Sequence, residues 1–81
     1  MRDDLPYQVH YAEARGENAQ ADLRAWLTYI SKQPGFMSAE LLLSSTQSAL
    51  VLVASRWSKE VPQLILPKGV RGWEFTVLAS C

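Results

Sequence analysis

Two apolar stretches separated by a short polar gap constrain this chain more than any other feature of its sequence. Residues 36–43 and 49–57 are rich in aliphatic side chains, and the gap between them reads Ser-Ser-Thr-Gln-Ser. Apolar runs of strand length on either side of a polar turn are typical of a β-hairpin. We therefore predict two antiparallel strands here, on which the rest of the 81-residue chain must pack.

The segments that flank this hairpin predict two further strands and two helices. Residues 7–14 and 73–79 alternate in side-chain type, as strands do. Residues 19–32 predict a helix, because Asn18 can cap its first turn and apolar side chains recur at helical spacing. That apolar stripe consists of Leu23, Trp26, Leu27 and Ile30. Residues 59–66 predict a second, shorter helix.

The order of these elements predicts the fold class. A β-α-β-β-α-β order is typical of an α+β, ferredoxin-like domain with one antiparallel sheet and two helices on one face. A single such domain accounts for residues 1–81. Residues 50–53 are apolar at every position, whereas a strand with one wet face would alternate. Since the helices cover only one face, we expect a second copy of the chain to cover the other, in a homodimer.

Composition argues against several classes of partner. Eight basic and eight acidic side chains give no net charge, so neither nucleic acid nor an anionic membrane surface is expected as a partner. No apolar run approaches the roughly 18 residues of a membrane-spanning helix. The lone Cys81 and the absence of a signal-peptide core predict a cytoplasmic protein. With His10 as the single histidine and no cysteine cluster, no metal site is expected.

Alternation divides the first and last strands into two sets of side chains. The apolar sets, which we expect beneath the helices, are Tyr7, Val9 and Tyr11 with Trp73, Phe75 and Val77. The mixed sets, which we expect to face the dimer partner, are Gln8, His10 and Ala12, then Phe36, Ser38, Glu40 and Leu42, and finally Glu74, Thr76 and Leu78. A mostly apolar interior with a few polar groups is typical of a small-molecule site.

The hairpin also resembles a known family. The residues that carry the resemblance are Pro34, Gly35, Phe36, Ser38, Glu40, Leu41, Leu42, Val51, Leu52, Val53, Arg56, Trp57 and Ser58. Their pattern is similar to that of the antibiotic biosynthesis monooxygenase (ABM) family, within the dimeric α/β-barrel group. The resemblance implies a dimer whose interior is faced by Trp57. The haem-degrading branch carries an Asn on the first strand and a His on the second helix; this chain has His10 and no histidine in residues 59–66, so haem is not expected.

Two functions follow from these observations. In the first, a non-catalytic dimer binds a small apolar or aromatic molecule in its interior, or fills that interior with side chains. The candidate ligand-binding residues are Gln8, Glu40, Trp57 and Thr76. In the alternative, a cofactor-independent monooxygenase or related enzyme acts on an aromatic, polyketide-like substrate, with His10 as the catalytic base and Trp57 stacking on the substrate. Each residue has a structural reading too, because a single His or Trp on a strand often only packs.

Overall fold

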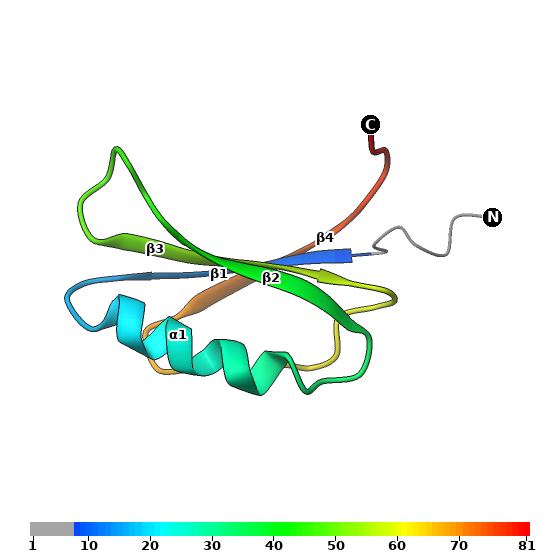
Figure 1. The fold of residues 1–81 in the computed structure, drawn as a ribbon, viewed down its shortest axis with the longest axis horizontal. Coiled ribbons are helices and arrows are strands. Elements are labelled where there is room, and N and C mark those ends of the chain that lie inside the picture. Colours follow the sequence, from blue (N-terminus) through cyan, green and yellow to red (C-terminus); the bar gives the residue numbers. More distant parts are fainter. Residues whose placement is uncertain (1–7) are drawn as a thin grey trace.

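The computed structural model describes residues 8–81 as one sheet with one helix. In chain order the elements are β1 (Gln8–Arg15), α1 (Ala19–Ile30), β2 (Phe36–Leu43), β3 (Leu50–Trp57) and β4 (Arg71–Thr76). The four strands are antiparallel neighbours in the order β2-β3-β1-β4 (Figure 1). Because β3 lies between β1 and β2, which α1 connects, this is a split β-α-β arrangement. The α+β class and the four strands are confirmed, with the element order β-α-β-β-β.

The predicted hairpin forms between β2 and β3, with Leu43 opposite Val51 at the turn end. Its polar turn closes on Ser44, whose Oγ accepts hydrogen bonds from the backbone N–H groups of Thr46 at 3.2 Å and Gln47 at 2.9 Å. A serine hydroxyl can replace a backbone acceptor in a tight turn in this way. The register shifts between Phe36 and Ser38. We expected these two side chains on one face, but the shift places Phe36 beside Trp57 and Ser38 on the opposite face.

Helix α1 covers one face of the sheet through the predicted stripe. Leu23, Trp26 and Ile30 are buried, and Leu27 is half-buried against the same core. Asn18 occupies the N-cap position, but its side chain makes no capping hydrogen bond. The helix ends at Ile30, before the predicted end. Within residues 8–81, no helix is long and apolar enough to cross a membrane.

The core beneath α1 pairs large side chains with small ones. On β1 the buried residues are Ala12 and Ala14, which leave room for the bulky side chains of the helix. Larger side chains come from β3, where Val51, Val53 and Trp57 are buried. Close packing of this kind requires a small residue wherever a large one descends from the opposite layer.

The prediction of a second helix is wrong. Residues 58–70, which we call the cover segment, run without helix or strand along the same side of the sheet as α1 (Figure 1). Pro62 explains the difference, because it falls where a helix begun after Ser58 needs its first internal N–H donor, and the proline ring clashes with the preceding turn. Pro67 then ends the stretch, so the two prolines leave room for little more than one turn of helix.

The faces predicted for β1 and β4 are also wrong. His10 and Ala12 lie beneath α1, whereas Tyr11 packs on Phe75 on the opposite side of the sheet. Alternation separates a strand into two sets but does not say which set is covered, and we ranked the sets by apolar character. The structure instead places the smaller set under the bulky helix. Tyr7 lies outside the described residues.

Candidate functional site

Four of the five candidate site residues share the face of the sheet that α1 and the cover segment occupy. Gln8 is the cross-strand neighbour of both Trp57 and Thr76, and its Nε2 donates a hydrogen bond to Thr76 Oγ1 at 3.4 Å. His10 lies two residues further along β1, where its cross-strand neighbours are Ser55 and Glu74. Glu40 is exposed on the opposite face. The sheet therefore brings Gln8, His10, Trp57 and Thr76 together and separates Glu40 from them; the roles predicted for these residues stay predictions.

His10 is a buried imidazole with a free nitrogen. The residue is 4% exposed, and its Nδ1 has no hydrogen-bond partner among residues 8–81. Its ring centroid lies 5.9 Å from that of Trp26 on α1, with the rings inclined at 44°. Burial lowers the pKa of His10 below its ordinary value of 6.5, and the charge of Glu74 across the strand opposes this shift. The imidazole is therefore neutral at pH 7 and can take up a proton or share a hydrogen bond.

Gly72 makes the room for this imidazole. It lies on β4 opposite Ala12, and a Cβ built on it would be 2.9 Å from His10 Nε2 and 3.2 Å from Leu66 Cδ1 of the cover segment. Atoms do not pack at the first of these distances, so only glycine fits here without a shift. The sequence contains no pattern that would have identified Gly72 as part of the site.

Trp57 is a packing residue in this arrangement. Its side chain is fully buried, and its ring meets Phe36 edge-on at 5.5 Å. Its Nε1–H donates to Ser55 Oγ at 2.9 Å, and that hydroxyl donates to the carbonyl oxygen of His10 at 3.3 Å. The chain of hydrogen bonds satisfies the indole inside the core. A ligand could reach Trp57 only after the core opened.

An apolar pocket lies where the cover segment meets α1. It has a volume of about 280 Å³ and is lined by Trp26, Tyr29, Ile65, Leu66 and Pro67. The sequence reasoning missed this pocket, because it placed a helix where the cover segment runs. The signal that could have found it is the pair Pro62 and Pro67, which forbids that helix.

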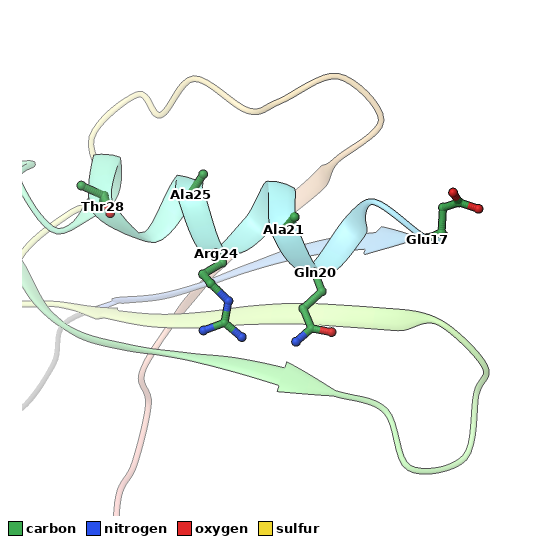
Figure 2. Close-up of a pocket in the computed structure, with 6 residues that line it drawn as sticks. All are labelled: Glu17, Gln20, Ala21, Arg24, Ala25 and Thr28. Atoms are coloured by element: carbon green, nitrogen blue, oxygen red, sulfur yellow. The ribbon is translucent and has the colours of Figure 1, made fainter.

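A larger hollow of about 610 Å³ lies on the outer side of α1, along Gln20, Ala21, Arg24, Ala25 and Thr28 and the preceding Glu17. In Figure 2 the longer side chains, Gln20 and Arg24, extend away from Ala25 and Thr28, and Glu17 points outward at the start of the helix. These groups converge on no common point. The hollow is an open surface of the helix and brings no reactive groups together.

The sheet face turned away from α1, which we call the open face, carries apolar side chains that no helix in the described part of the chain covers (Figure 1). Its members are Val9, Tyr11, Glu13, Arg15, Ser38, Glu40, Leu42, Leu50, Leu52, Ala54, Arg56, Arg71, Trp73 and Phe75. Phe75 is 53% exposed and Trp73 39% exposed. Tyr11 and Phe75 meet edge-on at 5.7 Å, and the Arg71 guanidinium lies 5.5 Å from the centre of the Trp73 ring.

Neither the geometry nor comparison assigns a metal or a family. Among residues 8–81, no group of three or more His, Cys, Asp or Glu side chains is placed to hold a metal ion. Comparison of the chain with protein-family models, with curated proteins and with solved structures gives no match. The likeness of residues 34–58 to the ABM family therefore remains a hypothesis drawn from the sequence.

Proposed function

We propose that the protein is a homodimer that binds a small apolar or aromatic molecule between two facing sheets. The observation that carries the proposal is the open face, on which three aromatic side chains, Tyr11, Trp73 and Phe75, lie together and no helix of residues 8–81 covers them. Contiguous exposed apolar surface of this kind usually marks an interaction site. Amphipathic rings such as Tyr and Trp suit both a protein partner and a bound aromatic molecule.

The distribution of charge on the open face supports a second copy as the partner. An isologous interface must be self-complementary, because the same patch contributes from both sides. The open face carries acidic Glu13 and Glu40 as well as basic Arg15, Arg56 and Arg71, together with apolar side chains. A second copy brings charges of both signs to the interface. A partner of one charge sign would leave the groups of that same sign unmatched.

Sedimentation velocity at micromolar concentration tests the dimer. The wild-type chain is expected to sediment as a dimer, and Trp73→Lys as a folded monomer, because a lysine in the interface would bury a charge. Ile65→Lys is the matched control, since Ile65 is an exposed apolar side chain, 74% exposed, on the other side of the sheet. A monomeric wild type, or equal behaviour of the two variants, would exclude the open face as the interface.

A neutral fluorescent probe tests the ligand site. N-phenyl-1-naphthylamine gains fluorescence in apolar enclosures, and we expect a saturable gain with the wild type that disappears in monomeric Trp73→Lys. A gain that is unchanged in Trp73→Lys would place the probe elsewhere than between the sheets. No gain with the wild type would indicate an interior filled with side chains.

A second candidate is an enzyme of the cofactor-independent monooxygenase type, favoured by the buried neutral imidazole of His10 with its free Nδ1. His10 would accept a proton from an acidic C–H of an aromatic substrate, and dioxygen would then oxidise the resulting carbanion. Oxygen uptake with anthrone, an aromatic ketone with an acidic C–H, tests this candidate. Uptake above the uncatalysed rate that is lost in His10→Ala supports it, and uptake unaffected by that change contradicts it.

A further inference from the structure

The apolar pocket at the cover segment lies close to the buried imidazole of His10. Among the described residues, Nδ1 of His10 is the buried side-chain nitrogen or oxygen atom without a hydrogen bond. Trp26 lines the pocket and also lies 5.9 Å from the His10 ring, centre to centre. Leu66 lines the pocket as well, and its Cδ1 reaches the space above Gly72 beside His10 Nε2. Trp26 and Leu66 thus form the wall between the pocket and His10.

Leu66, one of these two residues, belongs to the cover segment, which few hydrogen bonds hold in place. Among residues 8–81, three hydrogen bonds join the middle of the cover segment to β1 and α1, and in each of them one partner is a side-chain atom. Val61 N–H donates to Gln8 Oε1 at 2.7 Å, Ile65 N–H donates to Tyr29 Oη at 3.0 Å, and Trp26 Nε1–H donates to the Ile65 carbonyl at 2.8 Å. A segment without ladder hydrogen bonds opens at a lower free energy than paired strands. Leu66 can therefore move without unfolding the sheet.

The lining restricts the chemistry of an occupant. None of the five residues that line the pocket is charged, and the Trp26 and Tyr29 rings lie 6.4 Å apart at 38°. A charged molecule would lose its hydration there without a counter-charge. A cavity of about 150 Å³ holds one benzene ring and drug-sized sites begin near about 300 Å³, so a pocket of about 280 Å³ suits one or two rings. A hydroxyl can both donate and accept, and so can hydrogen-bond with a ring nitrogen of His10 in either tautomer.

We propose that this pocket binds an uncharged aromatic molecule of one or two rings that carries a hydroxyl group. The ring lies against Trp26, and the hydroxyl hydrogen-bonds with the imidazole of His10 once Leu66 has moved aside. The site lies on the opposite side of the sheet from the open face. The inference therefore goes beyond the proposed function and does not depend on the dimer.

The three tryptophans of the chain allow a direct test, because each reports a different region. Trp26 lies at the pocket, Trp57 in the core and Trp73 on the open face. In a titration of the full chain with 2-naphthol, followed by ¹H–¹⁵N spectra, we expect saturable shifts of the Trp26 indole N–H and of the His10 ring nitrogens. Naphthalene, which lacks the hydroxyl, is expected to bind about 2- to 13-fold more weakly, the equivalent of one neutral hydrogen bond.

Matched variants assign the effect to the pocket. Ile65→Ala removes an exposed lining side chain and is expected to weaken 2-naphthol binding, whereas Thr28→Ala, on the outer side of α1 (Figure 2), is expected to leave it unchanged. His10→Ala should abolish the preference for 2-naphthol over naphthalene. Saturable shifts of Trp73 alone would overturn the inference and support the site between the sheets. No saturable shift at Trp26, or equal affinity for both probes in the wild type, would also overturn it.

Discussion

The two faces of this sheet are built from the same four strands but are completed in different ways. Along β1, the face under α1 presents His10, Ala12 and Ala14, all buried, while the open face presents Val9, Tyr11 and Glu13, which are only half-buried. The two alanines leave room for the side chains of α1, and the larger Val51, Val53 and Trp57 on β3 fill the rest of the covered face. The comparison indicates that the apolar character of a strand's side chains does not by itself decide which face a helix covers, because side-chain volumes must also match between the layers. It also explains why the open face keeps large apolar side chains available for a partner.

The largest expected difference between the faces comes from truncating a leucine on each side. Leu23 is fully buried beneath α1, so Leu23→Ala is expected to lower the free energy of unfolding by about 2 to 5 kcal/mol. Leu42 on the open face is 41% exposed, so Leu42→Ala should change it by less than about 0.5 kcal/mol in dilute protein, where a dimer dissociates. Urea denaturation measures both. Equal losses at low concentration would show that the open face is covered within one chain.

The sequence predicted the parts of the fold that rest on local signals. The polar gap at Ser44 and the apolar stripe of α1 each depend on neighbours in the chain, and the hairpin and helix follow from them. The last strand was placed two residues too late, at 73 instead of Arg71, because Gly72 reads as a turn residue. Its glycine is needed for a contact with His10, which comes from another strand.

The candidate site was predicted in its members but not in its position. Gln8, His10, Trp57 and Thr76 do lie together, because they share one face of neighbouring strands. Which face that is depends on how Trp26 packs against β1, a contact between elements that alternation cannot encode. The apolar pocket beside Trp26 could not be predicted either, because a helix over residues 59–66 would place its lining side chains differently.

A smaller effect than that of Leu23 is expected from filling the space that Gly72 leaves. Gly72→Ala brings a Cβ to 2.9 Å from His10 Nε2, and such overpacking is expected to cost about 1 to 3 kcal/mol of unfolding free energy. His10→Ala should relieve this cost, so the double variant should be more stable than the sum of the two single changes predicts. The double-mutant cycle is measured by thermal or urea unfolding. Strictly additive changes in unfolding free energy would mean that the His10 ring does not lie against Gly72 in solution.

The pH dependence of stability is expected to arise from the covered face. The folded state lowers the pKa of His10 below 6.5, so between the folded and unfolded pKa values the unfolded chain binds more protons. Stability from this group is complete above about pH 7 and is lost as the pH falls through that window, with a slope of at most about 1.4 kcal/mol per pH unit. Urea denaturation from pH 8 to pH 5 should show this loss in the wild type and a flatter profile in His10→Ala. Identical profiles would exclude a buried His10.

The smallest expected effect is the influence of one carboxylate from each face on the pKa of His10. Glu74 is exposed but lies across the strand from His10, and its charge favours the protonated ring, so Glu74→Gln should lower the pKa of His10 further. At pH 7, where His10 is already neutral, the same change should alter stability by less than about 0.5 kcal/mol. Glu40→Gln is the matched control, because Glu40 is an equally exposed carboxylate on the open face. An NMR titration of His10 should therefore move in Glu74→Gln and not in Glu40→Gln. If both variants changed the pKa of His10 equally, the two carboxylates would act through bulk solvent. The cross-strand position of Glu74 next to His10 would then have no specific effect on that pKa.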